Sequence, residues 1–147
     1  MKPLILSALL AISLMSFASG TKEKNVASYR LTYNFNAEFG QVDNVKWSSA
    51  MNDMTRADFI LDDEPVCAYF NDQGDFVAAT KTITFKDLPK KLQTAVLEKV
   101  PGAKIETIFE MSSPEEKSWF IETNVNNEKK VWKGTSFGSI TRYYVKH

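Results

Sequence analysis

The stretch LTYNFNAEFGQVDNVKW, residues 31–47, changes its hydrophobic period once, and this change decides the predicted fold. Its first part carries apolar residues spaced by four, four and three positions, which places Leu31, Phe35, Phe39 and Val42 on one face of a helix. Its last part alternates as a half-buried strand does. Further strand-like runs follow, so the stretch predicts a helix that packs against a sheet.

A second stretch, residues 88–105, shows the same change of period. Sliding the sequence on itself by 58 residues pairs Phe39 with Leu97 and Val42 with Val100. A slightly larger offset of 61 pairs Phe59-Ile60 with Phe120-Ile121, and self-similarity of this kind is typical of an internal duplication with insertions in loops. The predicted fold class is therefore α+β, with two tandem helix-plus-four-strand repeats over about residues 28–85 and 86–147. Both helices are expected to pack on one face of an antiparallel sheet.

The period also predicts element bounds and a core. Ser28 and Thr32 are both candidate N-caps of the first helix, and Pro89 fits the first turn of the second. Helices are expected over residues 28–41 and 88–99, and strands over residues 45–51, 55–61, 66–71, 76–85, 103–111, 117–125, 129–137 and 139–146. The expected core contains Phe35, Phe39, Trp47, Leu92, Val96 and Trp119.

The N-terminus is typical of an export signal. Lys2 precedes an apolar stretch, residues 4–15, which is too short to span a bilayer comfortably. Small residues at Ser16 and Ala18 predict cleavage after Ala18, with cleavage after Gly20 as the alternative. We expect a signal peptide in residues 1–20, one domain in residues 21–147, and a periplasmic or secreted product without stable membrane insertion. An uncleaved N-terminal anchor is the other interpretation.

Composition and charge narrow the class of protein. The 147 residues are 44% hydrophobic, which is too apolar for a disordered chain. Basic and acidic residues balance at 18 each, and no run of Lys or Arg is dense enough to mark a nucleic-acid surface. Nucleic acid is therefore not an expected partner.

The chain offers few residues for catalysis or for a cofactor. The only histidine is His147, at the end of the chain, and the only cysteine is Cys67, in a strand-like run. A buried thiol in apolar surroundings is inert. Zinc would need His and Cys ligands that the sequence lacks, and no phosphate-binding glycine motif occurs. We expect no enzyme, no metal and no cofactor.

Carboxylates form the remaining candidate groups. Asp62, Asp63 and Glu64 are consecutive, and Asp72 and Asp75 lie close together without the spacing of a calcium loop. Both groups fall at predicted turns, where Asp is a turn former in its own right. A pair of catalytic carboxylates, as in a glycosidase, stays open because nothing in the sequence selects one pair.

Adjacent aromatic residues suggest a binding surface. Neighbours in a strand point to opposite faces, so the pairs Tyr69-Phe70, Trp119-Phe120 and Tyr143-Tyr144 each place one ring away from the helices. Facing Trp119 and Ile121 toward the helix leaves Phe120 on the open side, and facing Ile105 and Phe109 inward leaves Ile108 outward. Aromatic rings among charged groups are typical of protein-binding surfaces, although a homodimer could equally cover them. The candidate partner-binding residues are Phe120, Trp132, Tyr69 and Tyr144.

Several short motifs resemble the PepSY-like family, which is related in fold to β-lactamase inhibitor proteins. They are Leu88-Pro89, Pro101-Gly102-Ala103-Lys104-Ile105, Asn44-Val45-Lys46-Trp47 after Phe35 and Phe39, and Tyr69-Phe70-Asn71 before Gly74. The sequence departs from the family at Asp58-Phe59, where many members are more aromatic. The resemblance implies an exported, non-enzymatic domain, with inhibition of a secreted enzyme as the known theme. It supplies no catalytic residues.

Two classes of function follow. The first is an exported, non-catalytic protein-binding module that acts on a periplasmic or secreted enzyme, with inhibition as the implied effect. The alternative is a small-ligand carrier, or an enzyme that uses an unrecognised carboxylate site. A broad aromatic face favours the first class, and a deep apolar pocket with converging acids favours the second.

Overall fold

The computed structural model describes residues 28–144 of the chain, so the predicted signal peptide lies outside the described residues. The elements, in chain order, are α2 (Tyr29–Phe39), β1 (Lys46–Ser49), β2 (Thr55–Leu61), β3 (Glu64–Phe70), β4 (Phe76–Ile83), η1 (Phe85–Asp87), α3 (Lys90–Lys99), β5 (Lys104–Ser112), β6 (Lys117–Val125), β7 (Glu128–Gly134) and β8 (Ile140–Tyr143). Among these elements no helix is long and apolar enough to cross a bilayer.

The predicted α+β fold of two tandem helix-plus-four-strand repeats is wrong. The eight strands form a single antiparallel sheet in chain order, from β1 to β8, and the α-helices have only 11 and 10 residues, so the protein is mostly β. Alternating apolar residues mark a strand without revealing its partners. The strand β4 in particular does not close a four-stranded sheet, because it continues across the boundary between two compact units at Ala79 and Thr80.

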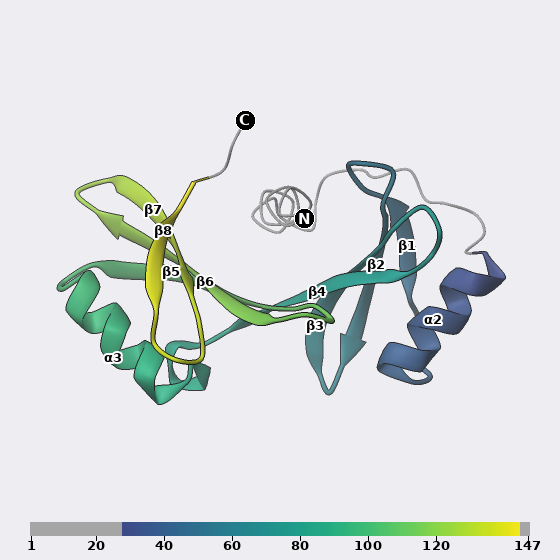
Figure 1. Cartoon of the computed structure of the whole chain (residues 1–147), viewed down its shortest axis with the longest axis horizontal. Coiled ribbons are helices and arrows are strands. Elements are labelled where there is room, and N and C mark those ends of the chain that lie inside the picture. The colour runs from purple at the N-terminus through teal and green to yellow at the C-terminus, as the bar shows by residue number, and fades with distance from the viewer. Residues whose placement is uncertain (1–27, 145–147) are drawn as a thin grey trace. The chain divides into compact units, whose positions relative to one another are not determined.

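The first unit, residues 28–79, is built around Phe35 of α2. This ring is 2% exposed and contacts the rings of Phe39, Trp47, Phe59 and Phe70, with centroids 4.9 to 6.2 Å apart. The helix thereby covers one face of β2 and β3 (Figure 1). Ser28 caps its first turn, since the Leu31 amide donates to the Ser28 hydroxyl at 3.3 Å, so of the two candidate caps it is Ser28 that acts.

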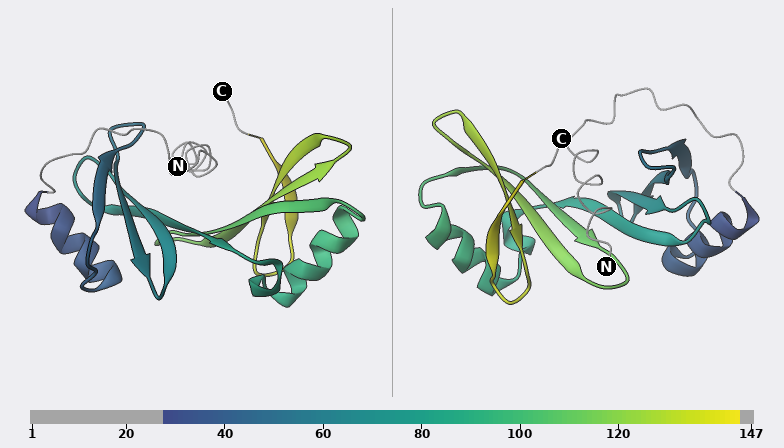
Figure 2. Two further views of the ribbon diagram at one scale, coloured as in Figure 1. Left: turned by 180° about the vertical axis from the view of Figure 1, so that it is seen from behind. Right: turned by 45° about the horizontal axis from the view of Figure 1, so that its top comes forward.

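The second unit, residues 80–144, has its own core beneath α3. Leu92 and Val96 pack on Ile108, Trp119 and Ile121, all nearly inaccessible to solvent. Figure 2 shows α3 beside these strands from two further directions. Pro89 is the N-cap of this helix.

Four of the six expected core residues are confirmed as buried. Phe35, Leu92, Val96 and Trp119 are buried. Phe39 and Trp47 are partly buried and pack against the core of the first unit.

Two five-residue loops share one backbone design. In residues 71–75, the Asn71 amide donates to the Asp75 carbonyl and the Gly74 amide donates to the Asn71 carbonyl, both at 3.0 Å. In residues 135–139, the Thr135 amide donates to the Ser139 carbonyl and the Gly138 amide donates to the Thr135 carbonyl, again both at 3.0 Å. Each loop joins two antiparallel strands and rests on the helix of its own unit.

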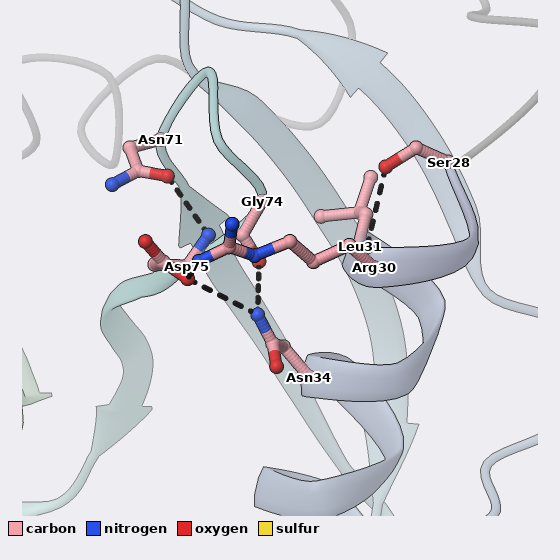
Figure 3. Close-up of polar contacts among 7 residues, drawn as sticks. All are labelled: Ser28, Arg30, Leu31, Asn34, Asn71, Gly74 and Asp75. Carbon is pink, nitrogen blue, oxygen red and sulfur yellow. Dashed lines mark hydrogen bonds and ion pairs between the residues drawn. The ribbon is translucent and has the colours of Figure 1, made fainter.

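The loop of residues 71–75 is fastened to α2 by side chains (Figure 3). Asn34 donates to the Gly74 carbonyl at 2.7 Å, and the Arg30 guanidinium pairs with the Asp75 carboxylate at 2.7 Å. Gly74 lies so close to α2 that a Cβ there would stand 3.1 Å from the Leu31 nitrogen. The turn is therefore part of the packing of the first unit.

Candidate functional site

Phe120 of β6 lies on the side of the strand opposite to Trp119 and Ile121. Those two residues pack with α3, which confirms their predicted facing. Phe120 is nevertheless only 1% exposed, and its ring meets the Tyr143 ring edge to face with centroids 5.1 Å apart. A partner cannot reach this ring without a rearrangement, so the expected open aromatic surface is absent at this residue.

Tyr69 and Trp132 are also unavailable as freely exposed anchors. Tyr69 is fully buried on β3, opposite Arg56 of β2. Trp132 of β7 lies on the helix side of its unit, half-buried against the core, and its indole N–H donates to the Thr123 hydroxyl at 2.9 Å. These two rings have structural contacts in the described conformation.

Tyr144 is the one predicted site residue that is open to solvent. It is 66% exposed and directly follows β8, the last strand of the sheet. The Arg142 guanidinium lies over its ring, 4.8 Å from the centroid, in a cation–π contact. Arg142 stands opposite Trp132 in the β7–β8 ladder, so it shares the helix side of the unit with that residue. Tyr and Arg are two of the residue types that most often carry binding energy at interfaces.

The facing predicted for β5 is half right. Ile105 packs against the helix-side core as expected, but a β-bulge between Ile105 and Thr107 inserts one extra residue. Every later side chain then changes face. Ile108 consequently enters the core at 3% exposure, whereas Phe109 stands opposite Phe120 on the other face. Both predictions beyond the bulge are wrong for this reason.

Ion pairs occupy the carboxylates that share a face with Phe120. The Lys129 ammonium lies 2.8 Å from Glu106 and 3.2 Å from Glu122, and Asn124 donates to Glu106 at 3.0 Å. The hydrogen bond from Lys129, followed by that from Asn124, lowers the pKa of Glu106. Glu106 is therefore ionised at neutral pH, and its pairing with Lys129 holds strands together and does not favour acid catalysis.

Cys67 has charged neighbours that the sequence did not reveal. Its thiol donates to the Asp58 carboxylate at 2.9 Å, and the Arg56 guanidinium reaches the same carboxylate at 2.6 Å and the sulfur at 3.2 Å. Burial and then the hydrogen bond to Asp58 raise the pKa of the thiol to about 12, so it stays protonated at neutral pH. Arg56 and Asp58 are two residues apart in β2, so both lie on the same face of the sheet as Cys67, which is opposite Asp58. This spacing is the sequence signal that could have indicated the cluster.

Most of the other carboxylate candidates lie at turns or loops, as expected, whereas Glu64 is the first residue of β3. Asp62 and Asp63 have positive φ angles in the turn between β2 and β3, and Asp75 pairs with Arg30. Nowhere in residues 28–144 do three His, Cys, Asp or Glu side chains gather in a way that could hold a metal ion.

Comparison with solved structures finds the same fold elsewhere. A BLIP-like protein from Bacteroides fragilis superposes with a TM-score of 0.74 at 12% identity, over 82% of this chain and 87% of that one. A DUF2874 family protein from Bacteroides uniformis gives 0.72 at 19% identity, over 80% and 88%. A Bacteroides eggerthii protein, provisionally described as periplasmic, gives 0.70 at 15% identity, over 80% and 88%.

No family model matches the sequence, and no curated protein matches it. The chain thus shares its fold with a BLIP-like protein, and the expected relation in fold to β-lactamase inhibitor proteins is confirmed at this level. Membership of the PepSY-like family stays a prediction.

Proposed function

We propose that the chain is an exported, non-catalytic module that binds a protein partner. The observation that carries the proposal is the exposed pair of Arg142 and Tyr144 at the end of the sheet. An arginine stacked on a tyrosine offers planar donors and an apolar ring in one preformed unit, which loses little side-chain entropy on binding. The fold, shared with a BLIP-like protein, supports the same class of function.

Export is the first part of the proposal. A provisionally periplasmic neighbour of the same fold supports it, as does the leader in residues 1–20. Mass spectrometry of the product from the cell envelope should give a mature chain that begins near Ser19. A product that retains Met1 in the membrane fraction would contradict export as a free domain.

Binding is tested with the mature chain as bait. Proteins captured from the exported fraction are identified by mass spectrometry, purified, and titrated against the wild type and Tyr144→Ala. We expect this substitution to weaken binding by about 2 kcal/mol, roughly thirtyfold. The matched control is Tyr33→Ala, which removes a ring of similar exposure, 63%, from α2. Equal loss in both variants, or no specific capture at all, would refute the proposal.

Inhibition is a separate readout. If the captured protein is an enzyme, the wild-type chain should lower its activity in proportion to occupancy, and Tyr144→Ala should shift the inhibition curve by the same factor as the binding curve. Binding without loss of activity would leave the module as a carrier or adaptor of that enzyme.

A further inference from the structure

The two five-residue loops share a glycine at the fourth position and carry different, exposed residues just before it. In residues 71–75 the residue before the glycine is Gln73, and in residues 135–139 it is Phe137. The backbone hydrogen bonds of the two loops are the same in pattern and in length. A glutamine therefore suffices for this turn, and the loop itself does not need an aromatic ring at the position.

Phe137 is 86% exposed, one of the most open large apolar side chains among the described residues. It contributes almost no buried area to the core of its unit. A single exposed apolar residue is common, but this one stands in a hydrogen-bonded loop that packs on α3, and its counterpart in the other loop is polar. That combination is typical of an aromatic anchor at a protein interface.

The loop packs closely on α3. Gly138 has a φ of +87° and lies so near the helix that a Cβ there would stand 3.1 Å from the Lys91 carbonyl oxygen. Gly134, at the end of β7, lies against Leu92, where a Cβ would come within 2.6 Å of the leucine side chain. Figure 1 shows the loop between β7 and β8 beside the start of α3. A ring presented on such a support is organised for binding in advance.

The surroundings of Phe137 are positively charged. Lys90 and Lys91 are exposed in the first turn of α3, and that turn contains no acidic residue. The nearby Asp87 accepts hydrogen bonds from the amide and the hydroxyl of Thr84, at 2.9 and 2.6 Å. Residues 80–144 contain 11 Lys and Arg against 8 Asp and Glu, a formal net charge of +3. An acidic surface is the electrostatic complement of this region.

We propose that Phe137 is an anchor that enters an apolar pocket on a protein partner, and that carboxylates at the rim of the pocket face Lys90 and Lys91. The inference rests on the proposed function and names a second contact for it, apart from Arg142 and Tyr144. The kind of partner follows from the chemistry: a folded protein with a small apolar depression in an acidic surface.

The test begins with cross-linking. A photoreactive p-benzoylphenylalanine replaces Phe137 in the mature chain, and the protein that it cross-links in the exported fraction is identified and purified. That purified protein is then titrated with the wild type, Phe137→Gln, the double variant Lys90→Glu with Lys91→Glu, and the control Gln73→Ala.

Phe137→Gln copies the residue of the other loop, so its thermal unfolding should match that of the wild type. We expect it to weaken binding about thirtyfold or more. The double lysine variant should weaken binding several-fold and reduce its dependence on salt, because these charges lie at the rim. Gln73→Ala should bind as the wild type does.

Four outcomes would overturn the inference. If Phe137→Gln binds the partner normally while Tyr144→Ala binds it weakly, the proposed function stands and the Phe137 anchor is wrong. If neither the wild type nor any variant binds a protein, the proposed function itself is wrong. If Phe137→Gln abolishes sedimentation with vesicles of equal parts phosphatidylcholine and phosphatidylglycerol, the surface serves a membrane. If it abolishes self-association in analytical ultracentrifugation, the occupant is a second copy, whose residues 28–79 carry a formal charge of −6.

Discussion

At the scale of single residues, the thiol of Cys67 lies between a carboxylate and a guanidinium that act on it in opposite directions. Asp58 accepts the thiol proton in a hydrogen bond, which favours the neutral thiol, whereas Arg56 would favour the thiolate. Burial decides between them, since it penalises the charged form, and the pKa rises to about 12. The raised pKa thus keeps the thiol unreactive, although the Cys67 side chain is only partly buried.

This pKa predicts low reactivity. At pH 8 the fraction of thiolate should be about a thousandfold smaller in the folded chain than in the unfolded one, where the pKa is 9.0. Iodoacetamide should therefore alkylate the native protein far more slowly than the protein in denaturant. Asp58→Asn should speed the reaction of the folded chain, and Asp62→Asn, in an exposed turn, should not. Rapid alkylation of the native wild type would contradict the assignment.

The same shift predicts a pH dependence of stability. The folded chain holds the thiol proton more tightly than the unfolded chain does, so this contribution is complete below pH 9 and is lost as the pH rises toward 12. The difference in unfolding free energy between the wild type and Cys67→Ser should accordingly shrink over that range. Urea denaturation at pH 7 and at pH 10.5 measures it. A constant difference would show that the thiol has an ordinary pKa.

At the scale of elements, α2 is held by one ring. Phe35 is buried beneath four other aromatic residues, whereas Tyr33, two positions earlier, points to solvent at 63% exposure. Phe35→Ala should lower the free energy of unfolding by about 3 to 5 kcal/mol, because the cavity opens in a packed cluster. Tyr33→Ala should change it by less than about 1 kcal/mol. Chemical denaturation of the two variants measures both changes. Similar losses of unfolding free energy would show that the face of α2 that packs on the sheet is misassigned.

The contact between the loop of residues 135–139 and α3 can be measured with glycines. Gly138→Ala adds a Cβ at positive φ and also presses it against the Lys91 carbonyl, so we expect a loss of about 1 to 3 kcal/mol. Gly102→Ala has a similar φ of +72° with nothing within 4 Å, so it should show only the backbone cost, about 1 kcal/mol. The difference between the two variants isolates the packing of the loop. Equal losses would mean that the loop is not fixed on the helix.

Elements were also where prediction from sequence succeeded best. The stripe of Leu31 and Phe35 gave the first helix to within two residues at its end, because burial repeats at the helical period. The bulge in β5 defeated the same reasoning, since one inserted residue leaves the apolar pattern locally plausible on either face. Likewise the exposure of Tyr144 and the burial of Phe120 depend on contacts between strands, which alternation alone does not specify.

At the scale of the whole molecule, strand pairing was the property that the sequence concealed. Local patterns identify each strand, but the choice between two sheets and one depends on whether β4 stops or continues. The apolar side chains of Phe76 and Ala78 predict a strand in both cases. Pairing is a non-local property, and it therefore required the structure.

The continuous strand predicts cooperative unfolding. Since β4 contributes residues to both compact units, melting either unit disrupts a strand of the other. Scanning calorimetry should show one transition whose calorimetric and van't Hoff enthalpies agree. Phe35→Ala and Leu92→Ala, one in each core, should both move that single peak. Two separate peaks, each moved by only one variant, would show that the units melt independently.

The ends of the sheet have a consequence for solubility at high concentration. β1 and β8, the outermost strands, are also the shortest, with four residues each, and they carry Lys46 and Arg142. An eight-stranded sheet with long, neutral borders would be a template for fibril growth by strand addition. Short edge strands that carry positive charge lack both the length and the charge neutrality that an incoming chain needs to extend a cross-β sheet. The protein should therefore resist amyloid formation even when it is crowded.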